Sequence, residues 1–510
     1  MEKFRWSRSG KIDSEVYVEL SKYTIDVTKP SYQADSVNFY NKDYFSRPLL
    51  GRLEDKVASI SNPDNVRYPK FSSYQTTVVL SDIIKGVNYR GGFAQHGAQI
   101  IGQGTAREPA IIEIKRENRP FFEARASQFL FKINDVPEDE QERRWWQRKQ
   151  NTSQQTRNRI VSSNARVVIK LEGDSLVHPG LKFTLYTDDR AVSLIRIKGD
   201  LSETPYTDSY HKIEMRFELL NWSIDDPLME FGSYKWSSDK DATFESFDYF
   251  KEFKFDKLMG ISDWHPLSEI KRCAKQLNTN VLTSMDIARC LRMPPTSVEP
   301  MLLELSVQGY LSFDEESKVC ILLPKLEHQV LSKSEMKDYD VLSIESVADA
   351  STSFQNATLN LLNNELTIKG VDRIILSDSH NVQIFPGDRT IKMRKNRDFD
   401  FNGLISSGKV EFFGTDFQFL YDEFKIYMPT IDSIQLWAST DRVDDQGYKL
   451  EARVQTVIEK VEGELEIDHP MNKSGVSQRP EFPIFSSFAE SYAFYDKKEI
   501  HEGVYDRDKF

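Results

Sequence analysis

Short runs of alternating apolar and polar residues fill most of this 510-residue chain and constrain its fold more than any other feature. Between residues 15 and 235 the runs are bounded by Gly, Pro, Asn or Asp, as in "TTVVL", "AIIEI", "QFLFKI", "ARVVIKL" and "LKFTLY". Such runs are typical of strands that lie between turns. No helical pattern separates them, so the sequence predicts a mainly β fold, either a short-strand β-solenoid or a sandwich or jelly roll.

The same kind of pattern returns after residue 336, in "DFDFNG", "GKVEFFG" and "TDFQFLYD". Apolar pairs recur there every seven residues, with Gly414 or Asp422 between them: Val410/Phe412, Phe417/Phe419 and Phe424/Ile426. A five-residue strand followed by a two-residue corner fits this spacing. The aromatic content of 12% also favours β-sheet.

Between the two β-rich regions the apolar period changes to that of a helix. "FESFDYFKEFKFDKLMG", "PLSEIKRCAKQL" and "SMDIARCLRM" predict helices, the last with Ser284 as its N-cap. After Pro294-Pro295 a further helix is expected, with Thr296 and Glu299 as a capping box and Gly309 at its end. "YLSFDEESKVCIL" then predicts a hairpin that turns at residues 314–317. This order of elements predicts a winged-helix-like domain.

The charges of this domain disfavour binding to DNA. The helix that would enter the major groove carries Glu299 and Glu304 and no Lys or Arg, and the hairpin tip contains Asp314, Glu315 and Glu316. Binding to a duplex depends on cations that neutralise phosphates. The net charge of −12 agrees with this exclusion. We therefore expect the domain to serve structure or protein contacts, with no nucleic acid as partner.

The sequence predicts three parts: an N-terminal β-rich domain over 1–242, a helical domain over 243–335 and a C-terminal β-rich domain over 336–510. The first contains a mobile charged insertion at about 134–159. Within it, "ERRWWQRK" places Arg143, Arg144, Trp145 and Trp146 together as a candidate partner-binding surface. The alternative is that one tryptophan packs onto the β-domain and the charges are solvated.

The cysteines Cys273, Cys290 and Cys320 lack the spacing of a zinc site and are expected to be small buried residues that are not bonded to each other. No apolar run reaches the length of a membrane span, and no signal peptide is visible. Because the cysteines lack the spacing of a zinc site, we predict no metal, and we also predict no cofactor.

Two Asp-Ser-x-x-His-like stretches attract attention as candidate catalytic sites. They are Asp174, Ser175 and His178, and Asp208, Ser209 and His211. Neither lies in a nucleophile elbow, and turn chemistry explains both, with His178 in a turn before Pro179-Gly180. The glycine-rich stretch 91–104 lacks a phosphate-binding pattern and fits close-packed strands better. We therefore predict no catalytic residue.

Several stretches resemble a family of very large, uncharacterised exported proteins of Bacteroidetes. They are "DSLVHPGLKFTLY", "DSYHKIEMRFELLNW", "NATLNLLNNELTIKGVDRIILSDS", "KNRDFDFNG" and "PIFSSFAESYAFYDKKEIHEGVYDRDKF". The resemblance covers most of the chain and implies a cell-envelope or periplasmic location. It also implies that the chain is an internal part of such a protein, truncated within its apolar C-terminal stretch. The family has no established activity to carry over.

Two functions are consistent with these features. The first is a non-enzymatic scaffold or interaction segment of a large cell-envelope protein, whose partner is a protein or the rest of the same polypeptide. The alternative is a carbohydrate-binding or carbohydrate-active β-solenoid protein with a polysaccharide as its partner. An enzyme of that class requires paired carboxylates in an aromatic-lined cleft.

Overall fold

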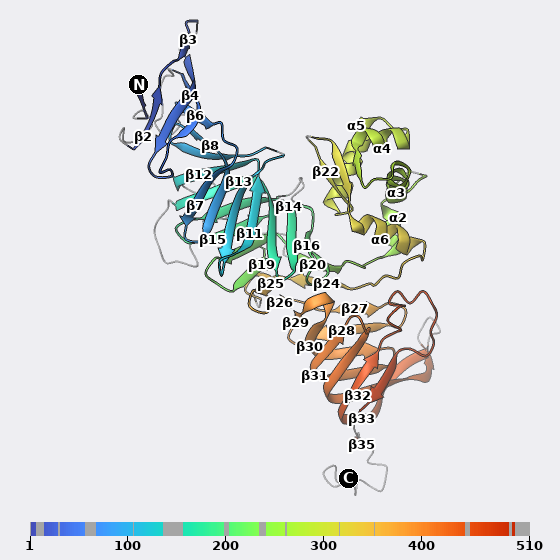
Figure 1. The fold of residues 1–510 in the computed structure, drawn as a ribbon. Helices are drawn as coiled ribbons and strands as arrows, with labels where there is room; N and C mark the ends of the chain where they lie inside the picture. The colour runs from blue at the N-terminus through green and yellow to red at the C-terminus, as the bar shows by residue number, and fades with distance from the viewer. Residues whose placement is uncertain are drawn as a thin grey trace. The chain divides into compact units, whose positions relative to one another are not determined.

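The computed structural model describes residues 2–6, 15–28, 31–56, 68–105, 107–135, 157–197, 203–233, 241–260, 263–315, 317–350, 352–443, 449–488 and 492–494. The described chain is mainly β, with 55% of residues in strands, 13% in helices and a large antiparallel sheet (Figure 1). The mainly β prediction is therefore confirmed. The three-part division at 242/243 and 335/336 stays a prediction.

The chain divides into two compact units. Unit 1 comprises Met1–Ser202 and Leu219–Met229, and unit 2 comprises Glu203–Glu218 and Glu230–Phe510. Strand β19 (Leu228–Gly232) contains one of the boundaries. Each unit is described by itself below.

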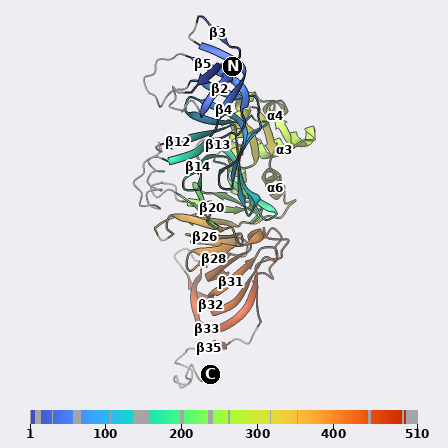
Figure 2. The same ribbon diagram turned by 60° about the vertical axis from the view of Figure 1, so that its left-hand side comes forward.

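Unit 1 is a β-meander, in which most neighbouring strands are also neighbours along the chain. Its strands are β1 (Glu2–Arg5), β2 (Val16–Leu20), β3 (Thr24–Asp26), β4 (Ser31–Asn41), β5 (Leu49–Lys56), β6 (Lys70–Ser73), β7 (Val78–Ile84), β8 (Val87–His96), β9 (Gln99–Gln103), β10 (Ala110–Arg116), β11 (Arg119–Ala126), β12 (Gln128–Asp135), β13 (Arg157–Leu171), β14 (Asp174–Tyr186), β15 (Ala191–Ile195) and β18 (Leu219–Ser223). Figure 2 shows β12, β13 and β14 side by side, and these neighbours pair antiparallel.

Two of the expected short strands of unit 1 belong to longer ones, since "ARVVIKL" lies within β13 and "LKFTLY" lies within β14. Strand β10 pairs with β11, with a register shift between Ile114 and Lys115, and strand β9 pairs with β12. The chain between β9 and β10 belongs to neither pairing, and the amide of Gly104 donates to the carbonyl of Ser127 there. The glycine-rich stretch 91–104 lies in β8, its turn and β9, which confirms its interpretation as close-packed strands.

The turn predicted at His178 is wrong. His178 is buried inside β14, where one extra residue of β14 is accommodated between the pairs Ala165–Leu181 and Val167–His178. Such a β-bulge bends the strand without ending it. The amide of Gly180 donates to Nδ1 of His178 at 3.1 Å within the bulge.

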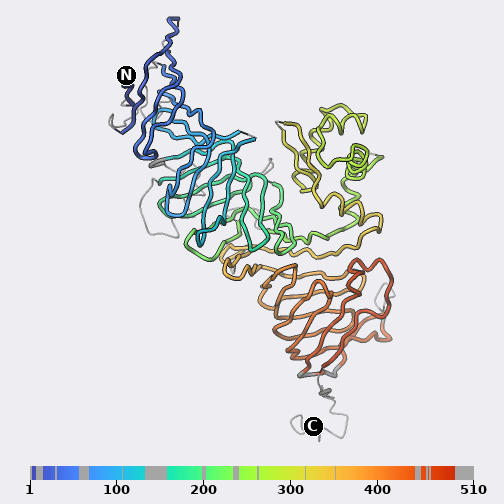
Figure 3. Tube along the Cα trace, in the orientation of Figure 1, coloured from blue at the N-terminus to red at the C-terminus, as the bar shows by residue number. Residues whose placement is uncertain are grey.

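Unit 2 contains antiparallel strands before and after its helices in the sequence. They are β16 (Tyr206–Asp208), β17 (Ile213–Arg216), β20 (Asp241–Ser246), β24 (Ser343–Val347), β25 (Gln355–Asn360), β26 (Glu365–Lys369), β27 (Ile374–Ser377), β28 (Val382–Pro386), β29 (Thr390–Met393), β30 (Phe399–Ser407), β31 (Val410–Leu420), β32 (Lys425–Val443), β33 (Lys449–Glu466), β34 (Ile484–Ser487) and β35 (Tyr492–Phe494), with a 3-10 turn η4 at Lys395–Arg397. Figure 3 follows the Cα trace of β30 to β33 through successive hairpins.

The seven-residue apolar spacing marks a corner at Asp422, where residues 421–424 form the turn between β31 and β32, but it marks no corner at Gly414. Residues 410–420 form the single strand β31, whose register shifts between Phe413 and Gly414. A side chain on Gly414 would meet the carbonyl of Thr430 at 2.1 Å and the ring of Phe417 at 2.7 Å. Opposite β30, two residues of β31 between Gly414 and Phe417 face one residue between Phe401 and Gly403. This bulge reverses the alternation, so that Phe412 and Phe417 are both buried although they are five positions apart.

Five helices lie between the strands of unit 2 in the described residues. They are α2 (Glu252–Lys257), α3 (Pro266–Leu277), α4 (Ser284–Leu291), α5 (Pro295–Val307) and α6 (Pro324–Lys333). A small antiparallel sheet accompanies them, formed by β21 (Val281–Thr283), β22 (Leu311–Asp314) and β23 (Val319–Leu322). These elements share a core that includes Ile270, Ile287, Leu302 and Phe313.

Three local details of this helical region differ from the prediction. Residues 244–246 belong to strand β20, so the first expected helix is reduced to α2. Thr283, not Ser284, caps α4, in a capping box with Asp286. Helix α5 already begins at Pro295, because proline is favoured at the first helical position, and the expected Thr296–Glu299 capping box is absent.

The prediction that the cysteines are unbonded is wrong. Cys273 of α3 and Cys290 of α4 form a disulfide, with 6.0 Å between their Cα atoms. The spacing of 17 residues gave no sign of it, because the packing of the two helices brings the side chains together. Cys320 is free and buried, as expected, and burial raises the pKa of its thiol to about 12.

In the described residues, every helix is too short or too polar to cross a bilayer.

Candidate functional site

One of the sequence candidates lies outside the described residues, and a second lies along a single strand. Arg143, Arg144, Trp145 and Trp146 lie outside the described residues. Asp174, Ser175 and His178 all belong to β14, in which Asp174 faces Leu171 and Ser175 faces Lys170 of β13. This arrangement along one strand does not place a serine and a histidine as a nucleophile and its base.

Asp208 and His211 do come together, but as a closed structural contact. Both side chains are buried, and Nδ1 of His211 lies 2.6 Å from Oδ2 of Asp208. Nε2 of His211 lies 2.9 Å from the carbonyl oxygen of Asn364. Both ring nitrogens therefore face oxygen acceptors, and neither is positioned to remove a proton from a substrate. The contact ties the β16–β17 turn to the turn before β26.

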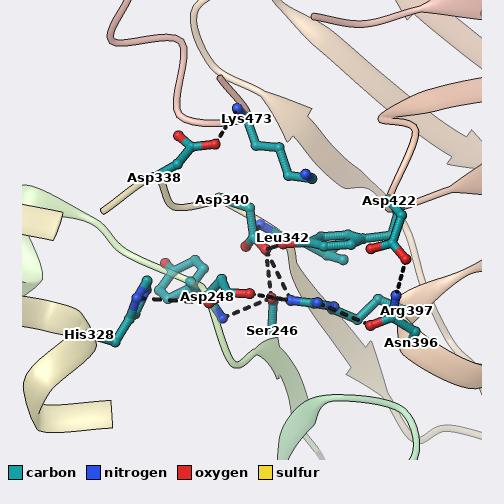
Figure 4. Close-up of polar contacts among 12 residues, drawn as sticks. Ser246, Asp248, His328, Asp338, Asp340, Leu342, Asn396, Arg397, Asp422 and Lys473 are labelled. Carbon is teal, nitrogen blue, oxygen red and sulfur yellow. Dashed lines mark hydrogen bonds and ion pairs between the residues drawn. The ribbon is translucent and has the colours of Figure 1, made fainter. Parts of the chain in front are cut away.

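An extensive polar site among the described residues of unit 2 consists of Ser246, Asp248, Asp340, Arg397 and Tyr421, which we call the Asp340 cluster. Ser246 ends β20, Asp340 precedes β24, and Arg397 and Tyr421 flank the hairpin of β30 and β31. Figure 4 shows Ser246, Asp248, Asp340 and Arg397 converging from these separate segments.

Asp340 lies at the centre of the cluster and is 1% exposed. Its Oδ2 accepts hydrogen bonds from the hydroxyls of Ser246 and Tyr421, both at 2.6 Å. Its Oδ1 accepts from the amide of Leu342 at 3.0 Å. Burial raises the pKa of Asp340, whereas the hydroxyl donors and Arg397 act in the opposite direction.

Arg397 provides the positive charge of the cluster. Its guanidinium donates to Asp248 at 2.8 Å and to the Ser246 hydroxyl at 3.0 Å, and it lies 3.5 Å from the centroid of the Tyr421 ring. This cation–π contact is desolvated, since Arg397 is 6% exposed. The Nε atom is buried with no hydrogen-bond partner among the described residues.

Asp248 connects the cluster to the helices. Lys337 donates to its Oδ1 at 3.0 Å, and Nδ1 of His328 on α6 lies 3.8 Å from the same oxygen. Burial acts to raise the pKa of Asp248, but hydrogen bonds from Arg397 and Lys337 prevail and lower it to about 2. Asp248 is therefore a carboxylate at neutral pH.

A second group of contacts involves the Tyr421 ring and the loop 470–474. Nζ of Lys473 lies 4.9 Å from the centroid of this ring. Asp338 accepts from the backbone amides of Lys473 and Ser474 at 2.8 and 3.1 Å, which holds the loop 470–474 beside the chain that leads into β24 (Figure 4). Burial lowers the pKa of Lys473.

This geometry serves structure better than catalysis. Asp340 has both oxygens committed to internal donors and almost no exposed surface. Sequence reasoning missed the cluster because its members are single polar residues in turns, separated by up to 175 positions between Ser246 and Tyr421. The nearest signal was the density of charges in "KDYD" and "KNRD", which does not identify the partners.

The described residues contain no group of three or more His, Cys, Asp or Glu side chains placed to hold a metal ion. No protein-family model matches the sequence, and neither a curated protein nor a solved structure shows significant similarity to it.

Proposed function

We propose that this chain is a non-enzymatic scaffold segment of a large cell-envelope protein. The observation that carries the proposal is the Asp340 cluster, whose charges and hydroxyls are used to connect segments of unit 2. Buried charges are costly unless they are paired, and removing one partner leaves the other charge buried and unpaired. An arrangement of this kind favours one relative placement of the helices and the strands.

In this proposal the helical region is winged-helix-like and provides structure or protein contacts. The order of α3, β21, α4, α5, β22 and β23 supports this assignment. The carboxylate of Glu299 on α5 accepts a hydrogen bond from Lys318 of the hairpin at 3.0 Å. That lysine is thereby engaged within the domain, and α5 carries no Lys or Arg for phosphate.

The Cys273–Cys290 disulfide supports the proposed cell-envelope location, because disulfides persist mainly in oxidising compartments. The resemblance to exported Bacteroidetes proteins points in the same direction. We further propose that Arg143, Arg144, Trp145 and Trp146 contact a protein partner or another part of the same polypeptide.

Hydrogen exchange of the full chain tests the scaffold proposal. Arg397→Met should reduce amide protection both in α6 and in β30–β31, because the cluster connects these elements. The matched control is Arg394→Met, which removes an exposed ion pair with Asp400 and should leave protection in α6 unchanged. Loss of protection in β30–β31 alone would contradict the proposal.

A polysaccharide assay tests the competing enzymatic function. We expect no release of reducing ends or unsaturated products from neutral and uronate-containing polysaccharides. Turnover by the wild-type chain that disappears in a folded Asp340→Asn variant would contradict the scaffold proposal and support the enzymatic function.

A further inference from the structure

The C-terminal sheet of unit 2 borders a half-open apolar cavity that the proposed scaffold function does not explain. The cavity has a volume of about 360 Å³ and lies against the strands β30 to β34. Its walls include Val410, Phe412, Ile434, Leu436, Ile458 and Phe485. Only Ser407 and Ser487 contribute polar side chains to the lining, and no charged residue does.

Strand alternation builds the walls. Val410 faces Leu436 and Phe412 faces Ile434 across β31 and β32, so these four side chains share one face of the sheet. That face curls strongly. Phe485 of β34 lies three strand positions from Phe412 of β31, a separation of at least about 14 Å in a flat sheet. Their ring centroids are nevertheless only 5.0 Å apart.

Local irregularities produce this curl and open the space. The β32–β33 register shifts between Met428 and Ile431 and again between Gln435 and Trp437. At Gly463 of β33 a side chain would approach the Phe485 ring to 2.7 Å. The glycine therefore lets this ring lie over β33 and form a wall.

One end of the curled face is filled and the other is open. Phe419, Ile426 and Leu465 form a row across the sheet and are at most 2% exposed. Toward the Val410 end, the side chains of Val410, Leu436 and Ile458 are only half-buried. The unfilled volume thus lies at the mouth of a curled sheet, where ligand sites are often found.

We propose that this cavity binds the aliphatic chain of a single acyl ligand. Apolar cavities disfavour water and accept apolar molecules instead. The volume falls in the range of about 300 to 1,000 Å³ that is typical of small-molecule sites. A sugar would leave most of its hydroxyls without partners here. A protein interface takes about 20 to 30 residues a side, whereas 11 residues line this cavity.

Calorimetric titration of the full chain with dodecanoate, below its micellar concentration, and with dodecanol tests the proposal. We expect saturable binding of both, since the aliphatic chain provides the recognition. Leu436→Trp and Ile458→Trp should each weaken binding at least tenfold by filling the open part of the cavity. The matched control is Phe413→Trp on the opposite face of β31, which should bind like the wild type.

Sedimentation with phosphatidylcholine vesicles separates two sources of the same acyl chemistry. Binding of dodecanoate without vesicle binding identifies a free ligand, and vesicle binding that Leu436→Trp abolishes identifies a chain within a bilayer. Three results overturn the proposal: no binding of either probe, equal binding by the folded Leu436→Trp variant, or self-association of the wild type that Leu436→Trp abolishes. The last result would assign the cavity to a second copy of the chain.

Discussion

The hydroxyl of Tyr421 donates a 2.6 Å hydrogen bond to a carboxylate oxygen of Asp340, 81 positions earlier in the chain, and the acceptor is almost completely buried. The ring of the same tyrosine lies against the guanidinium of Arg397. One side chain thus connects the β31–β32 turn to the chain that enters β24. This relationship makes the stability of unit 2 sensitive to single atoms of the cluster.

Tyr421→Phe removes one oxygen and keeps the ring against Arg397. We expect it to lower the free energy of unfolding by about 2 kcal/mol, because Asp340 loses a buried donor. Urea unfolding at pH 7 measures the effect. The control is Tyr427→Phe, whose hydroxyl donates to Glu462 at 2.8 Å in a more exposed place and should matter less. Equal effects of the two substitutions would contradict the importance assigned to the buried bond.

Asp248 makes the stability of the protein depend on acid pH. The pKa of its carboxyl is lowered to about 2 in the folded chain, from an ordinary value of 3.8. A lowered folded pKa gives stability that is fully present above the unfolded pKa and is lost as the pH falls through the folded one. Asp248→Asn should therefore cost about 2 kcal/mol at pH 7 and much less near pH 2. Unfolding curves for both proteins between pH 2 and 7 test this, and a difference that does not depend on pH would refute it.

Asp340 acts in the opposite direction, because burial raises its pKa. A raised folded pKa means that stability is lost as the pH rises from the unfolded value through the folded one. Relative to the wild type, Asp340→Asn should gain stability as the pH rises through this window. The same unfolding series provides the measurement. A relative stability of the variant that falls as the pH rises would contradict the direction.

The disulfide predicts a distinct pattern of thiol labelling. In the denatured, unreduced protein only Cys320 should react with an alkylating reagent, and all three cysteines should react after reduction. Cys273→Ala combined with Cys290→Ala should cost about 3 kcal/mol, the usual effect of opening a loop of this length. Three labelled cysteines before reduction would show that the bond is absent.

The charges of the helical region predict no salt-sensitive affinity for duplex DNA. Glu299 and Glu304 on α5 and Asp314 on the hairpin would place negative charge against phosphate. Fluorescence anisotropy with the full chain, at 50 and 200 mM salt, should show no binding at micromolar protein. Micromolar or tighter binding that weakens at the higher salt would require another docking orientation, through the basic residues of α3 and α4.

The sequence by itself determined the mainly β class and the position of the helical region. Both follow from local rules: a period of two predicts strands, and a period of 3.6 predicts helices. The helix that follows Pro294 and the stop at Gly309 were predictable for the same reason, since proline and glycine act on the backbone next to them.

Only the tertiary structure decided which runs belong to one strand. The pairing of β9 with β12 and of β10 with β11, and the bulge of β31 between Gly414 and Phe417, depend on hydrogen bonds between segments, which the period of a single run does not contain. The Asp340 cluster, the disulfide and the Phe412–Phe485 contact are of the same kind. Each joins residues through packing across the fold. They could not be predicted because their partners are determined by distance in space and not by spacing along the chain.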